Sequence, residues 1–193
     1  MFQPLRPRRR QVLLIRLSRH STQSLWAGLG GAIALLLILL TSSLFVHQPL
    51  ATLLVASMGA SAVLLFAAPS APLSQPWNLL GGQVLSALVG VTCAQFVEQP
   101  WLSAALAVGI SILLMGLLAC THPPGGATAL SAVVGGPGIS ALGYQYVLTP
   151  VLLNSMIILG VALLFHRPTR TYPLRAKGAP RRRLLRSPGG ALS

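Results

Sequence analysis

Residues 101–130 read WLSAALAVGISILLMGLLACTHPPGGATAL, and this stretch decides the class of fold. Its first part, as far as Ala119, is an uncharged apolar run. A run of about 20 apolar residues in an α-helix is long enough to cross the hydrocarbon core of a bilayer. The run ends in a Pro-Pro-Gly-Gly sequence, which interrupts a continuous helix. The stretch therefore predicts a transmembrane helix followed by a break.

Similar apolar runs lie on both sides of this stretch. We predict clear spans over residues 25–45, 50–68, 77–97, 101–119 and 144–165. The links between them contain prolines, and three prolines within residues 69–76 argue against a helix there. Only 8% of the residues are charged, whereas soluble domains carry about 25%. The chain is therefore expected to be all-α, a single polytopic bundle of transmembrane helices.

The charges are confined to the two ends of the chain. Fourteen Lys and Arg stand against one acid, Glu98, and every base lies outside residues 26–166. This pattern divides the chain into a basic tail (residues 1–20), a membrane domain (21–166) and a second basic tail (167–193) that we expect to be disordered. Basic tails stay on the cytoplasmic side and attract anionic lipid headgroups. We therefore expect both termini in the cytoplasm of a cell with a bacterial plasma membrane, and no nucleic acid as a partner.

Two cytoplasmic tails require an even number of crossings, but the clear spans number five. The segment between residues 125 and 140 is then expected to cross as well, as a short helix with extended backbone, which gives six crossings. The alternative is that one of the other segments fails to cross. Non-helical backbone at membrane depth is tolerated only where protein buries it or water reaches it. We therefore look for function in this broken segment.

Two short stretches resemble each other. Residues 59–62 read Gly-Ala-Ser-Ala and residues 126–129 read Gly-Ala-Thr-Ala, and each precedes a Pro- or Gly-rich link and a full span. The chain can thus be divided into two units of three segments, residues 21–97 and 101–166, the second inverted relative to the first. Inverted 3+3 repeats are typical of transporters, whose sites lie between the units. The alternative is that these small residues only pack helices closely.

The broken segment is also the best candidate for a substrate site. Prolines open a helix at no cost in hydrogen bonds, glycines let a ligand approach the backbone, and a helix N-terminus favours anions. An ionisable residue inside the membrane is a functional candidate by default. The candidate substrate-binding residues are His122, Gly125, Gly126, Ala127 and Thr128, with Gly59, Ala60 and Ser61 of the first unit. The alternative is a simple hinge in which His122 only bonds to the backbone.

Other polar and small residues have structural interpretations. Gly82, Ser86 and Gly90 recur every four residues, which predicts a face for close helix contact. Asn78 and Asn154 are expected to bridge helices. Five aromatic residues lie at span starts and are expected to anchor the chain at the interface, namely Trp26, Trp77, Trp101, Tyr144 and Tyr146.

No enzymatic constellation is present in the sequence. Acid–base chemistry with two carboxylates needs a second acid beside Glu98. Neither a nucleophile elbow nor a phosphate-binding loop occurs, and no His or Cys spacing suits a metal. We therefore expect a protein without catalytic residues, metal or cofactor that is not an enzyme.

Residues 121–130 resemble the defining motif of the HPP family of bacterial and plant membrane proteins. Residues 58–82 and 142–154 also resemble stretches of that family, so the resemblance covers about residues 20–166. The family is usually described as four-spanning, which differs from the six crossings expected above. Some plant and cyanobacterial members are associated with nitrite transport, so the resemblance implies a small-anion transporter or channel, with nitrite favoured. Because so few helices enclose little cavity, a homo-oligomer is expected in the lipid bilayer. The alternative is a structural scaffold or subunit whose basic tails bind lipid or a partner.

Overall fold

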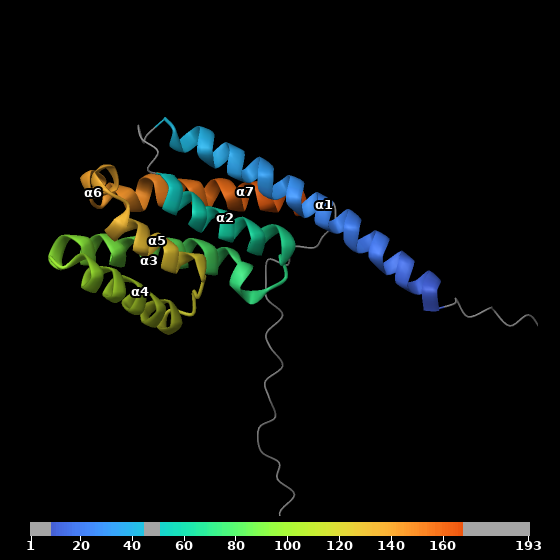
Figure 1. Ribbon diagram of the computed structural model, residues 1–193, viewed down its shortest axis with the longest axis horizontal. Coiled ribbons are helices and arrows are strands. Elements are labelled where there is room, and N and C mark those ends of the chain that lie inside the picture. Colours follow the sequence, from blue (N-terminus) through green and yellow to red (C-terminus); the bar gives the residue numbers. More distant parts are fainter. Residues whose placement is uncertain (1–8, 45–50, 168–193) are drawn as a thin grey trace, which may run out of the picture.

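The computed structural model describes residues 9–44 and 51–167, with side chains placed from residue 22 to 44 and from 56 onward. All regular structure in these ranges is helical, which confirms the all-α prediction (Figure 1). The elements are α1 (Arg9–Ser42), α2 (Ala51–Ala67), a 3-10 helix (Pro72–Ser74), α3 (Pro76–Phe96), α4 (Pro100–Leu117), α5 (Pro124–Val134), α6 (Pro137–Leu142), and a π-helix (Val147–Leu152) that continues into α7 (Leu153–His166). The expected link at residues 47–49 and most of the C-terminal tail lie outside the described residues.

Four helices start at a proline. Pro76, Pro100, Pro124 and Pro137 are the first residues of α3, α4, α5 and α6. A proline at this position loses no hydrogen bond, because the first N–H groups of a helix have no partner within it, and its fixed φ already suits the helix. The prolines that divide the apolar runs therefore also set where the next helix begins.

Four helical segments are long and apolar enough to cross a membrane: Thr22–Ser42, Pro76–Phe96, Pro100–Leu117 and Val147–His166. The apolar helices α2 and α5 are shorter, with 17 and 11 residues. They correspond to the predicted second span and to the broken segment. The broken segment is thus helical from Pro124 to Val134, and its non-helical backbone lies just before Pro124 and again at Gly135 and Gly136.

Several predicted boundaries are wrong. Helix α1 begins at Arg9, inside the expected tail, because neither Pro nor Gly interrupts the chain between Arg9 and Ala27. The link at residues 69–76 contains one 3-10 turn, and the Gly-rich link after α5 contains the short helix α6. The last span is irregular at its start, since Thr149 has non-helical backbone angles before Pro150.

Successive long segments run in alternating directions through the bundle, and α5 runs back along α4 (Figure 1). The chain therefore traverses the bundle six times within the described residues. The first and last segments meet at one end, where the ring of Trp26 in α1 lies 5.8 Å from that of Phe165 in α7. This arrangement has the parity expected for two tails on one side.

Each helix of the first unit has a counterpart in the second: α4 for α1, α5 for α2 and α7 for α3. When every helix is replaced by its counterpart, the main pairs of contacting helices stay the same. Contact of α1 with α2 corresponds to that of α4 with α5, and contact of α1 with α7 to that of α4 with α3. Likewise α2 with α7 corresponds to α5 with α3, while the pairs α2–α5 and α3–α7 correspond to themselves. Small-residue packing alone does not require such a correspondence, so this pattern supports the inverted repeat.

Helix α5 lies in the centre, in contact with α2, α3 and α4. Its closest approach is to the predicted contact face of α3. A Cβ added to Gly125 would lie 2.6 Å from Ser86 Oγ and 2.9 Å from the Gly82 carbonyl oxygen. Only glycine fits at that distance, so the prediction of a close helix contact on α3 is confirmed.

Candidate functional site

Five buried polar side chains meet between α2, α3 and the start of α5. They are Ser57 and Ser61 of α2, Gln83 of α3, His122 just before α5, and Thr128 of α5, and each is 0% exposed. We call them the polar cluster. Polar groups out of reach of water are costly unless they are hydrogen-bonded, so their partners define what the cluster does.

His122 joins the α4–α5 break to the first unit. Its Nδ1 lies 3.0 Å from the Leu73 carbonyl oxygen, and its Nε2 lies 2.9 Å from Ser61 Oγ. A carbonyl can only accept, so Nδ1 carries a proton. Ser61 Oγ can either donate to Nε2 or accept from it, since its own proton has a second acceptor in the Ser57 carbonyl oxygen at 3.0 Å. His122 can therefore take up a second proton when one hydroxyl group rotates.

Gln83 ties the two units together. Its Nε2 donates to Ser57 Oγ at 3.2 Å and to Ser61 Oγ at 3.1 Å, and its Oε1 accepts from the Thr128 hydroxyl. Ser57 Oγ in turn lies 2.7 Å from Thr128 Oγ1 and 2.7 Å from the Pro124 carbonyl oxygen. The hydroxyls of Ser57 and Thr128 have one proton each. These two protons serve three contacts: Thr128 with Gln83, Ser57 with Thr128, and Ser57 with the Pro124 carbonyl oxygen. Alternative proton arrangements are thus built into the cluster.

Tyr146 closes the cluster on the side of the last segment. It is 0% exposed, and its hydroxyl donates to the Thr128 carbonyl oxygen at 3.0 Å. Its prediction as an interfacial anchor is therefore wrong, because the chain turns inward after α6. Tyr144, two residues earlier, is exposed, as expected for an anchor.

The structure brings three of the predicted site residues together, namely Ser61, His122 and Thr128. The others lie elsewhere. Gly125 packs against α3, Gly126 faces Val108 of α4, and Ala60 is exposed, with Gly59 and Ala127 half-buried. The N–H groups of Gly125 and Gly126 already donate to the carbonyl oxygens of His122 and Pro123 at 2.8 and 3.1 Å. Side chains, rather than free amides at the start of α5, therefore form the site.

Sequence reasoning missed Ser57, Gln83 and Tyr146. Ser57 precedes Ser61 by about one helical turn, so the two side chains lie on the same face of α2. Gln83 is an amide inside an apolar span, and such groups form hydrogen bonds between membrane helices. Both signals are present in the sequence, whereas nothing local to Tyr146 distinguishes it from an anchor. The helix bridge expected of Asn154 is confirmed, from α7 to Ser42 Oγ of α1 at 3.0 Å, whereas Asn78 of α3 bonds at 2.9 Å to the Thr121 carbonyl oxygen in the link before α5.

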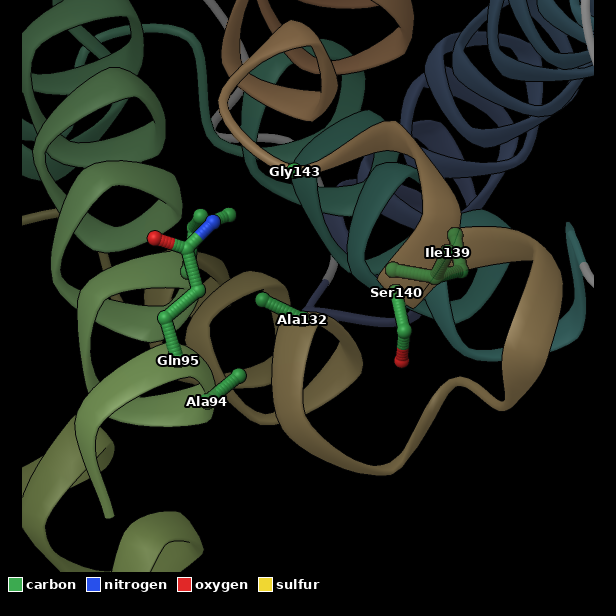
Figure 2. A pocket seen from close by; sticks show the side chains of 7 residues that line it. Ala94, Gln95, Ala132, Ile139, Ser140 and Gly143 are labelled. Atoms are coloured by element: carbon green, nitrogen blue, oxygen red, sulfur yellow. The ribbon is translucent and has the colours of Figure 1, made fainter.

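A pocket of about 110 Å³ opens beyond the polar cluster, at the far ends of α3 and α5 (Figure 2). Val91, Ala94 and Gln95 of α3, Ala132 of α5, and Ile139, Ser140 and Gly143 of the α6 region line it. Its floor residue Ala132 lies one helical turn after Thr128. At about 30 Å³ per water molecule, the pocket has room for roughly three. Gln95 and Ser140 are exposed, so the pocket opens at the surface.

No group of His, Cys, Asp or Glu within the described part of the chain has the geometry of a metal site. The two cysteines, Cys93 and Cys120, are free and buried. The side chains of the polar cluster offer hydroxyl, amide and imidazole groups only, all of which form hydrogen bonds without a fixed charge.

Bundle and cluster together define an integral membrane protein of the helical class, with a polar centre between α2, α3 and α5. The comparison with known families then identifies it further. Residues 17–173 match the transmembrane region of the HPP family, so the chain belongs to this family of transmembrane proteins. The resemblance in the broken segment is thereby confirmed.

Two relatives are transmembrane proteins of Dictyostelium discoideum. One is 40% identical over 127 residues, which is 63% of this chain and 44% of the relative, and the other is 36% identical over 155 residues, which is 77% of this chain and 50% of the relative. The chain thus spans about half the length of these relatives or less. No solved structure matches the chain.

Proposed function

We propose that the protein transports a small anion across the membrane, and that nitrite is the first candidate because of the resemblance in the broken segment. The observation that carries the proposal is the polar cluster. It joins the central helices of two inverted units, which is where transporters of this architecture hold their substrates. Its five side chains are fully buried and bonded to one another, and polar groups inside membrane proteins are expensive and often functional.

The chemistry of the cluster suits an anion. Hydroxyl and amide groups supply donors without a fixed charge, and the one acid of the sequence, Glu98, is exposed at the end of α3. A bound anion would take over donors that now serve one another, those of Ser57, Gln83 and Thr128. His122 would supply a proton with the anion, because its Nε2 faces a hydroxyl that can accept. Anion and proton would then cross together, without net charge.

The proposal includes location and partners. Basic residues at both ends, together with the contact of Trp26 with Phe165 at one end of the bundle, support cytoplasmic termini in a bacterial plasma membrane. The tails would contact anionic lipid headgroups. A homo-oligomer would cover part of α4, because only 22% of its membrane-spanning residues are buried within the bundle.

Nitrite uptake into proteoliposomes tests the proposal. We expect uptake above that of empty vesicles, and a loss of at least about tenfold with His122→Ala or Thr128→Val. Ser42→Ala is the matched control, because Ser42 also forms a buried hydrogen bond, to Asn154, but far from the cluster. Uptake should survive in this variant.

A structural role is the second candidate, and a specific observation favours it. Every side chain of the polar cluster already has hydrogen-bond partners, so the cluster also suffices to lock α2, α3 and α5 together. A scaffold would carry no anion. Uptake equal to that of empty vesicles, for nitrite and for other small anions, would decide for this reading.

A further inference from the structure

The pocket and the inverted repeat together point to a route into the polar cluster. The two units can be aligned so that Gly59 corresponds to Gly126. The same alignment pairs Leu65 with Ala132, Ile158 with Val91 and Ala162 with Gln95. Two equivalent regions thus lie at opposite ends of the bundle. One is formed by the ends of α3 and α5, and the other by the ends of α7 and α2.

These equivalent regions differ in packing. Val91, Gln95 and Ala132 line the pocket. Their counterparts Ile158, Ala162 and Leu65 are each 0% exposed and belong to the main hydrophobic core. Val91 and Ala132 belong to the same core, at 4% and 2% exposed, so the difference in burial lies at Gln95, which is exposed beside the pocket whereas its counterpart Ala162 is fully buried.

Aromatic side chains pack together at the end formed by α7 and α2. The rings of Phe66 and Phe165 lie 5.7 Å apart, edge to face, and Trp26 packs on Phe165 at 5.8 Å. His166 is buried beside them, with Nε2 3.0 Å from the Leu65 carbonyl oxygen. We call Trp26, Phe66, Phe165 and His166 the aromatic seal, of which Phe66 and His166 are buried, Phe165 is half-buried and Trp26 is 58% exposed.

Among the residues that the structure describes, no such group of rings lies at the pocket end. The same alignment pairs Phe165 and His166 with Glu98 and Gln99. Glu98 and Gln99 are both exposed. The difference between the two ends of the bundle thus follows from the different sequences of the two units. One unit ends in exposed polar residues, and the other ends in aromatic rings that pack on one another.

We propose that the pocket is the entrance through which a small hydrated anion reaches the polar cluster, and that the aromatic seal closes the exit. This inference rests on the proposed transport. The pocket floor at Ala132 lies one turn of α5 from Thr128, and Gln95 and Ser140 offer an amide and a hydroxyl at its mouth. The volume of about 110 Å³ accommodates an anion of three heavy atoms with some of its water. Separation of Phe66 from Phe165 opens the other end.

Reaction of single cysteines with a membrane-impermeant thiol reagent tests the entrance. Cys93→Ala and Cys120→Ala give a background without thiols. In right-side-out and inverted membrane vesicles, Ala132→Cys should react from one face only. Its counterpart Leu65→Cys should react at least about tenfold more slowly from either face. Adding Phe165→Ala should expose Leu65→Cys from the face opposite to that which exposes Ala132→Cys, and Phe66→Leu serves if Phe165→Ala fails to fold.

Blocking the pocket gives a second test. Ala132→Trp should lower nitrite uptake at least about tenfold, whereas Val134→Trp, on the exposed side of the same helix, should leave it unchanged. Equal reactivity of Ala132→Cys and Leu65→Cys, or uptake unaffected by Ala132→Trp, would overturn the entrance while transport stands. Asymmetric reactivity without any anion uptake would instead remove the proposed transport, and the entrance with it.

Discussion

His122 is the residue at which a proton can enter the cluster. Its Nδ1 is committed to the Leu73 carbonyl oxygen, but Nε2 faces the hydroxyl of Ser61, which accepts or donates equally well. A proton taken from one side of the membrane can therefore rest on Nε2 without leaving an unpaired group. Under the proposed transport, a protonated imidazole would therefore accompany an anion bound beside it.

An imposed proton gradient should therefore drive nitrite into proteoliposomes. We expect acid outside to accelerate uptake by the wild type, and a protonophore to abolish the acceleration. His122→Gln keeps a polar side chain at this position but cannot take up a proton, so its residual uptake should not respond to the gradient. The measurement is nitrite uptake with and without the gradient. A His122→Gln variant that responds like the wild type would place the proton elsewhere.

Gly125 and Gly126 are adjacent, but they face different surroundings. A Cβ at Gly125 would lie 2.6 Å from Ser86 Oγ and 2.9 Å from a backbone oxygen of Gly82, whereas at Gly126 the nearest atom is 4.0 Å away, on Val108. Gly125→Ala should thus overpack the α3–α5 contact and lower the free energy of unfolding by about 1–3 kcal/mol. Gly126→Ala should raise it by up to about 1 kcal/mol, because alanine favours the helix.

Thermal or denaturant unfolding of both variants in the same detergent measures this difference. Each substitution is the control for the other, because both add one methyl group to the first turn of α5. The same loss of stability in both variants would contradict the close approach of α5 to α3.

At the scale of the element, α5 shows what the sequence could and could not predict. The apolar runs, the proline starts and the parity of the tails predicted a crossing segment after Pro124, and an 11-residue helix lies there. The sequence also marked Ser61, His122 and Thr128. It could not place Gln83 among them, because that depends on how α3 packs across α2 and α5, and packing between distant segments leaves no local pattern. Tyr146 was misassigned for the same reason.

The direction of α5 can be tested by labelling its flanks. Asn78 at the start of α3 bonds to the Thr121 carbonyl oxygen just before α5, and the ends of α3 and α5 share one pocket, so the two helices run in parallel. Single cysteines at Gln99 and Pro137, introduced into the thiol-free background, should therefore react from the same face of membrane vesicles. A cysteine at Ser70 should react from the other face. Joint reaction of the Pro137 and Ser70 positions would show that α5 does not reverse the chain.

At the scale of the whole molecule, the basic tails decide which way the entrance faces. The seal includes Trp26, from the first turns of the apolar part of α1, and Phe165, close to the end of α7. It therefore lies at the end of the bundle from which both tails leave, and these tails are expected in the cytoplasm. The pocket, at the opposite ends of α3 and α5, must then face away from the cytoplasm.

With this expected orientation, the proposed entrance would receive its substrate from outside the cell. In intact cells, an impermeant thiol reagent should label Ala132→Cys, and prior nitrite should slow that reaction, because the anion occupies the pocket. Val134→Cys, two residues nearer the end of α5 but on its exposed side, should react at a rate that nitrite does not change. Labelling of Ala132→Cys only in inverted vesicles would reverse the orientation, so that the same pocket would receive substrate from the cytoplasm and the protein would export it.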